Sequence, residues 1–118
     1  MASSLLMLIE TVAGPMNWRL DRSRGHRSYL GRFLVYDQAG LISDYVRGRI
    51  DCRDGHSAEV YLYDPPAYLK KHSHGRCLQL LSPGSGWFKL HFEKPAYSFA
   101  DAYSFVELLL TEAFTLAH

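Results

Sequence analysis

The sequence predicts an α+β domain in which an antiparallel meander of about five strands is covered by a C-terminal amphipathic helix. Short runs rich in aromatic and β-branched residues recur between residues 29 and 93, separated by glycine, proline or Asp-Gly turns. After Ser98, apolar residues recur at intervals of three and four, which is the helical period. The chain has 118 residues, 47% hydrophobic and 21% charged, so a single globular domain over 1–118 is expected.

The expected elements follow one another along the chain. Residues 3–12 have helical spacing and allow a short N-terminal helix. The predicted strands are a short one within 16–22 and longer ones over 29–37, 41–52, 58–64, 76–81 and 87–93. Pro65 and Pro66 end the strand before them, because proline cannot donate to a sheet ladder, and a loop is expected from there to residue 75.

The C-terminal helix has a start signal and a broad apolar face. Ser98 stands where an N-cap belongs, and Asp101 falls at a favourable position in the first turn. The predicted stripe consists of Ala102, Phe105, Val106, Leu109, Leu110, Ala113 and Phe114. We therefore expect this helix to lie across the sheet and cover it.

Composition and charge exclude several classes of protein. The formal net charge is +1, so no overall field demands a nucleic acid or a membrane as partner. The apolar run LLMLIETVAG is too short to span a bilayer and lacks the basic start of a secretory signal. A cytoplasmic protein without membrane contact is predicted. A homo-oligomer is compatible with the apolar helix face.

The stretch DPPAYLKKHSHGRCLQLL, residues 64–81, carries the residue types with the most chemistry. Cys77 follows His72 and His74, and a thiol becomes nucleophilic where a histidine or another cation stabilises its thiolate. The simpler interpretation is a small buried hydrophobe at the start of an apolar strand. Two imidazoles are too few for a zinc site, so neither a metal nor another cofactor is predicted.

From residue 45 to residue 114, the order of features resembles the core of ubiquitin-conjugating enzymes, in particular their small bacterial relatives. The segment YVRGRIDCRDGHSAEVYLYDPP is similar to the family's meander with its Pro-Pro turn, and HSH, GRCLQLL, Trp87 and the helix follow in the family's order. The resemblance implies that Cys77 carries a ubiquitin-like modifier as a thioester, with His72 or His74 at the family's histidine position. It also implies a ubiquitin-like protein and an activating enzyme as partners.

The same stretch departs from the family pattern at a position that matters for catalysis. Ser73 or Gly75 follows the histidine, where the eukaryotic motif has proline and asparagine. That asparagine stabilises an oxyanion during transfer, so its absence removes a transition-state donor. A non-catalytic α+β protein-interaction domain is therefore an alternative. Its candidate interface residues are Tyr61, Tyr63, Trp87 and Phe99.

The arginine-rich segment RLDRSRGHRSYLGR, residues 19–32, raises a third alternative. Basic residues with aromatic neighbours suit the binding of anions or nucleic acids, although no recognised nucleic-acid motif surrounds them and a solvated loop is the simpler interpretation. The candidate anion-binding residues are Arg19, Arg22, Arg24 and Arg27, with Arg32 at the end of the segment. CLQLL, WFKLHF and the final helix also resemble the last strands and capping helix of pleckstrin-homology-like domains, which would make this segment a ligand site.

Overall fold

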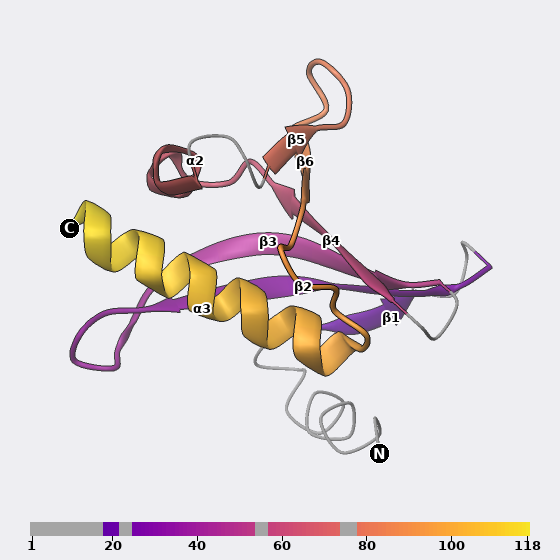
Figure 1. Ribbon diagram of the computed structural model, residues 1–118, viewed down its shortest axis with the longest axis horizontal. Coiled ribbons are helices and arrows are strands. Elements are labelled where there is room, and N and C mark those ends of the chain that lie inside the picture. Colours follow the sequence, from indigo (N-terminus) through magenta and orange to yellow (C-terminus); the bar gives the residue numbers. More distant parts are fainter. Residues whose placement is uncertain (1–17, 22–24, 54–56, 74–77) are drawn as a thin grey trace.

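The computed structural model describes residues 18–21, 25–53, 57–73 and 78–118. These residues form two layers, a six-stranded antiparallel sheet and a long helix that lies across one face of it (Figure 1). The predicted α+β class, with an antiparallel sheet under a C-terminal helix, is confirmed. The N-terminal helix expected over 3–12 lies outside the described residues.

The sheet has the strand order β1-β2-β3-β4-β6-β5. Its strands are β1 (Arg19–Asp21), β2 (Arg27–Tyr36), β3 (Ile42–Cys52), β4 (Ala58–Tyr63), β5 (Leu78–Leu80) and β6 (Trp87–Leu90). The first four form the expected meander, whereas β6 pairs with β4 and leaves β5 at the edge. The last strand is also shorter than predicted, and Phe92 beyond its end packs against the core.

Helix α3 (Phe99–Ala117) begins where the sequence predicts it. The Ser98 side chain accepts a hydrogen bond from the Asp101 backbone N–H at 3.2 Å. The predicted stripe is wrong at Phe105, which is 38% exposed and meets the Phe92 ring at the edge of the core. The buried residues of the helix are Phe99, Ala102, Tyr103, Val106, Leu110 and Ala113.

Helix α2 (Ala67–Ser73) occupies the segment for which a loop was expected. Pro66 lies directly before it and its carbonyl accepts a hydrogen bond from the Leu69 N–H at 3.0 Å, so the proline that ends β4 also starts a helix. Leu69 is fully buried, and the Tyr68 ring meets Phe114 of α3 edge to face. The connection from β4 to β5 contains this helix, and it skips the sheet position that β6 takes between the two strands.

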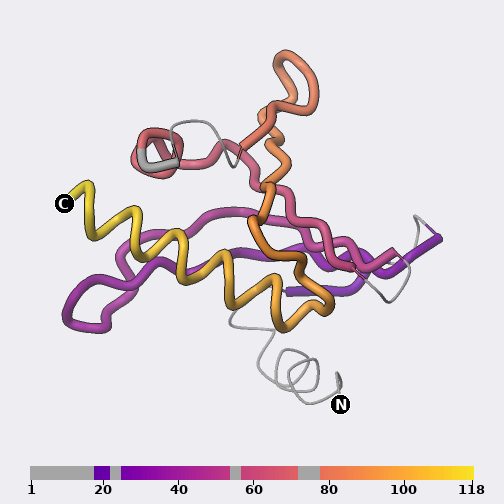
Figure 2. Tube along the Cα trace, viewed as in Figure 1, coloured from indigo at the N-terminus to yellow at the C-terminus, as the bar shows by residue number. Residues whose placement is uncertain are grey.

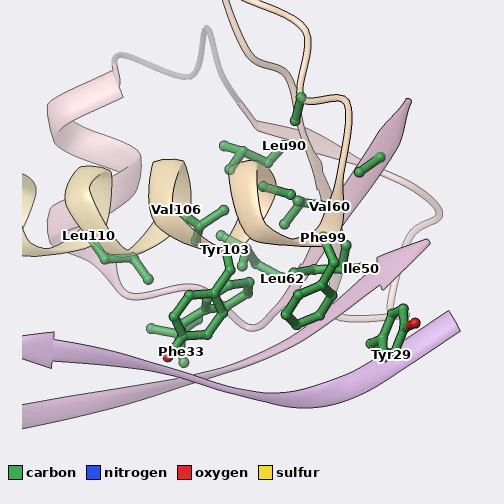
Figure 3. Close-up of a cluster of buried hydrophobic side chains, with 14 of the residues drawn as sticks. Tyr29, Phe33, Ile50, Val60, Leu62, Leu90, Phe99, Tyr103, Val106 and Leu110 are labelled. Atoms are coloured by element: carbon green, nitrogen blue, oxygen red, sulfur yellow. The ribbon is translucent and has the colours of Figure 1, made fainter. Parts of the chain in front are cut away.

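The core lies between α3 and the sheet face beneath it, which we call the inner face (Figure 3). Gly31 of β2 lies opposite Gly48 of β3 on this face. A Cβ atom on Gly31 would overlap the Trp18 ring, and one on Gly48 would overlap the Phe33 ring. The two rings meet edge to face with centroids 5.0 Å apart, so the paired glycines form the floor on which they pack.

The opposite sheet face, which we call the outer face, has no described helix on it. Helix α3 contacts β2, β3 and β4, and α2 packs against α3, so both described helices belong to the inner side. Figure 2 shows α3 running along the sheet and the β5–β6 hairpin projecting away from it. Neither described helix is long and apolar enough to cross a membrane.

Candidate functional site

The outer face combines arginine with aromatic side chains. Successive residues of a strand point to opposite faces, and Phe33, Val46 and Val60 are buried on the inner face, so their neighbours point outward. The outer-face side chains include Arg32 and Leu34 of β2, Tyr45, Arg47, Arg49 and Asp51 of β3, Glu59, Tyr61 and Tyr63 of β4, and Trp87 and Lys89 of β6.

A pocket of about 330 Å³ opens on this face over β1, β2 and β3; its lining residues are Arg19, Leu30, Gly31, Arg32 and Arg47. Arg32 and Arg47 are direct cross-strand partners, and Arg19 pairs with Leu30 on the next strand. Arginines from three strands therefore contribute to the lining of one pocket. We call it the arginine pocket.

Aromatic rings hold two of these guanidinium groups in position. The Arg32 Cζ atom lies 4.8 Å from the centroid of the Tyr45 ring. The Arg47 Cζ atom lies 5.3 Å from the Tyr63 ring and 5.9 Å from the Trp87 ring. Such cation–π contacts orient a guanidinium group without neutralising its charge.

A second charged cluster on the outer face is balanced by a carboxylate. Asp51 is fully buried and accepts a hydrogen bond from the Ser28 hydroxyl at 2.6 Å. Its oxygens also lie 3.2 Å from Arg49 Nε, 3.6 Å from His26 Nε2 and 3.9 Å from Arg53 Nη2. The two arginine contacts are charge contacts at ion-pair distance, whereas the Ser28 contact is a directional hydrogen bond. The arginines of this cluster therefore already have a carboxylate at ion-pair distance.

Glu59, on the neighbouring strand β4, is a second carboxylate that is paired with other side chains. The Tyr61 hydroxyl donates a hydrogen bond to it at 2.7 Å, and Lys89 Nζ lies 3.1 Å from its carboxylate. The hydrogen bond from Tyr61 and the contacts with Lys89 hold the pKa of the Glu59 carboxyl below its usual value, against the opposing effect of burial. This carboxylate is therefore already paired.

The basic side chains in the salt bridges of the described residues are His26, Arg49, Arg53 and Lys89, and neither Arg19 nor Arg47 is among them. Arg19 and Arg47 are both exposed.

The predicted anion-binding residues are only partly brought together. Arg19 lines the arginine pocket, Arg27 begins β2 on the inner-face side opposite Cys52, and Arg22 and Arg24 lie outside the described residues. The expectation of a solvated loop is wrong for Arg27, which belongs to β2, whereas Arg19 and Arg32 lie in the strands predicted within 16–22 and over 29–37.

The predicted interface residues do not form one exposed surface. Tyr63 and Trp87 lie on the outer face, with Tyr63 38% exposed, whereas Tyr61 is buried among its neighbours. Phe99, in α3, is buried against Tyr29 of the sheet, which rules it out as a surface residue. The difference arises because Phe99 is the first residue of a helix whose apolar face begins there.

Arg47 was not among the predicted site residues. Its signal was the spacing of Tyr45, Arg47, Arg49 and Asp51 at every second residue, which marks one polar face of a strand. Nothing in that spacing tells which arginine meets Arg32, because the partner depends on the register of β2 against β3.

The residues of the predicted thioester site lie largely outside the described part of the chain. Cys77 and His74 are outside it, and His72 belongs to α2 with a side chain that is not described. Carriage of a modifier on Cys77 therefore stays a prediction.

Cys52 provides the reference for testing that prediction. Burial and the nearby Asp51 raise the pKa of its thiol, while Arg27 acts in the opposite direction. In a Cys77→Ala chain we expect iodoacetamide to label Cys52 near neutral pH at least about tenfold more slowly than in urea, because access is hindered and little thiolate forms. In the unaltered chain, an additional fast phase would report a reactive Cys77. Labelling of Cys77 only in urea would contradict the thioester prediction.

A second pocket, of about 360 Å³, lies between the β2–β3 turn and the end of α3; its lining residues are Asp37, Gln38, Ala39, Phe114, Thr115 and His118. The Asp37 carboxylate accepts hydrogen bonds from the Ala39 and Leu41 N–H groups, both at 2.9 Å. The His118 ring stacks on Phe114 with centroids 4.0 Å apart. Turn formation and helix-end packing account for these groups.

Comparisons with protein-family models, with curated proteins and with solved structures found no match to this chain.

Proposed function

We propose that this chain is a non-catalytic binding domain that holds an anionic group in the arginine pocket. The observation that carries the proposal is the direct opposition of Arg32 and Arg47 on the outer face, with Arg19 lining the same cavity. Like charges directly opposite one another on neighbouring strands are destabilising. A bound anion would replace this repulsion with two attractive contacts.

Arginine suits this role because its planar guanidinium group presents a fork of donors that matches a carboxylate or a phosphate. The Tyr45 and Tyr63 rings orient the Arg32 and Arg47 groups before a ligand arrives. Less side-chain freedom is then lost on binding, which favours affinity.

Inorganic pyrophosphate at low ionic strength is a direct probe of this proposal. We expect it to bind the full chain in isothermal titration and to raise the thermal midpoint. Arg47→Gln should weaken binding roughly tenfold or more, because a charge-assisted hydrogen bond is lost.

The matched control is Arg27→Gln, which removes an exposed arginine from the same strand as Arg32 but on the other sheet face. It should leave pyrophosphate affinity unchanged. Absence of binding by the parent chain, or equal losses in the Arg27 and Arg47 variants, would refute an anion site at this pocket.

A further inference from the structure

We propose that two copies of this chain associate through β5, the strand at the edge of the sheet, so that their two sheets continue into one. Within the described part of the chain, β5 has a strand on one side only, because β6 lies between it and β4. The β5–β6 hairpin projects away from α3 (Figure 2). The proposed interface lies at the opposite end of the sheet from the arginine pocket and does not depend on the function assigned to that pocket.

The free edge of β5 presents the backbone groups of two leucines. The Leu81 N–H donates a hydrogen bond to the carbonyl of Trp87 in β6 at 3.1 Å. Along an antiparallel strand, every second residue is bonded to the same partner strand, so Gln79, two residues earlier, is also directed at β6. The N–H and C=O groups of Leu78 and Leu80 therefore point toward the free edge, where another strand can bind them.

This edge is complementary to a second copy of itself. The strand Leu78-Gln79-Leu80 reads the same in both directions, so an antiparallel pairing centred on Gln79 sets Leu78 of each copy opposite Leu80 of the other. Both members of each such pair direct their backbone groups at the shared edge, so every N–H group there finds a carbonyl. The same pairing brings leucine against leucine on the inner face and Gln79 against its own copy on the outer face, because successive residues alternate between faces. A two-fold axis perpendicular to the sheet relates the two copies.

The edge at β5 lacks the charged side chains that commonly prevent such pairing. Edge strands of soluble proteins are often protected by charge, and β1, at the other end of the sheet, carries Arg19 and Asp21. Strand β5 carries no charged residue, and neither does Leu81 directly after it. Leu80 is 44% exposed and Leu81 is 46% exposed, so apolar surface is left for a partner to cover. A copy of the same uncharged strand matches this surface in polarity.

The size of the interface determines how the dimer is detected. Stable protein interfaces bury about 1,000 Å² or more, whereas this ladder joins strands of 3 residues. We therefore expect a reversible dimer that dissociates on dilution. Sedimentation velocity of the full chain over a range of concentrations measures this equilibrium, and the sedimentation coefficient should rise with concentration. A monomer at every concentration, up to the limit of solubility, would overturn the proposal.

Exchanging charges at Gln79 tests the proposed register. Gln79 is exposed and its side chain contacts that of exposed His91 at 2.9 Å, so the fold should tolerate a change there. Gln79→Lys and Gln79→Glu each set like charges opposite one another in the dimer, and each variant alone should dimerise roughly tenfold more weakly than the parent, or less. An equimolar mixture of the two variants sets lysine opposite glutamate and should restore association.

The matched controls are Gln38→Lys and Gln38→Glu, which make the same changes at an exposed residue of the β2–β3 turn. They should dimerise as the parent does. A dimer that persists in both Gln79 variants would contradict pairing through β5. A mixture that associates no better than either Gln79 variant alone would contradict the register centred on Gln79.

Amide hydrogen exchange of the full chain locates the interface independently. The N–H groups of Leu78 and Leu80 point away from β6 and become bonded in the dimer, so their exchange should slow as the protein concentration rises. The Gln79 N–H is directed at β6 in monomer and dimer alike, and its exchange should change less. An association that leaves the Leu78 and Leu80 amides unprotected would place the interface elsewhere and overturn the proposal.

Discussion

Replacing Asp51 by alanine is expected to lower the free energy of unfolding by about 3 kcal/mol or more, because it leaves cations without their carboxylate in a largely buried place. The Asp51 side chain is 1% exposed, and those of Arg49 and His26 are 12% and 19% exposed. Ser28, fully buried, also loses the acceptor of its hydroxyl hydrogen bond. Urea denaturation of both chains at neutral pH, with midpoints and slopes compared, measures the difference.

Glu59→Ala is the matched control for this experiment. Glu59 is a carboxylate on the neighbouring strand, paired with Asp51 in the sheet register, but 31% exposed. Its removal should cost about 1 kcal/mol or less, as for other ion pairs near the surface. Equal losses in the two variants would contradict a structural role for burial of Asp51.

Gly48→Ala is expected to destabilise the fold by about 1–3 kcal/mol, since the added methyl group overlaps the Phe33 ring in a packed core. Without this overlap, alanine in a strand would be stabilising relative to glycine. A loss of stability in the Gly48→Ala variant would therefore indicate the overlap. Phe33 has no exposed surface, and the Trp18 ring contacts it edge to face at 5.0 Å. The ring therefore has little room to move. Thermal unfolding followed by circular dichroism provides the measurement.

A double-mutant cycle with Phe33→Leu isolates this contact. The smaller side chain leaves space for the methyl group, so Gly48→Ala should cost clearly less in the Phe33→Leu background than in the parent. Additive losses would mean that the overlap with Phe33 is not the cause of the destabilisation.

The elements with a local sequence signal could be predicted, and those that depend on tertiary context could not. Ser98 and the apolar period after it determine where α3 begins, because an N-cap and a helix face are local properties. Helix α2 was missed because Pro65 and Pro66 indicate a strand end equally well whether a loop or a helix follows. The placement of β6 between β4 and β5 has no signal in either strand, since both are short and apolar.

The sequence predicted which residue type the candidate site contains, but it did not predict how those residues are arranged. The arginines of residues 19–32 raised an anion-binding alternative, but Arg27 and Arg32 differ by an odd number of positions in one strand and so face opposite sides. The partner that completes the pocket, Arg47, comes from β3 through the pairing of Arg32 with Arg47. A register between distant segments is a property of the whole sheet, and sequence spacing within one segment does not contain it.

The strand order also sets the sequence of events by which this chain can acquire its structure. Strand β5 finds its backbone partner in β6, which follows it in the chain and must itself dock on β4. During synthesis, the β1–β4 meander can form from neighbours that have already emerged, whereas β5 waits for residues that come after it. Among the described elements, α3 is the one that covers the inner face of the meander, and it is the last of them in the chain. Residues such as Phe33, Ile50 and Leu62, fully buried in the finished structure, therefore gain this cover only once the C-terminal helix is available.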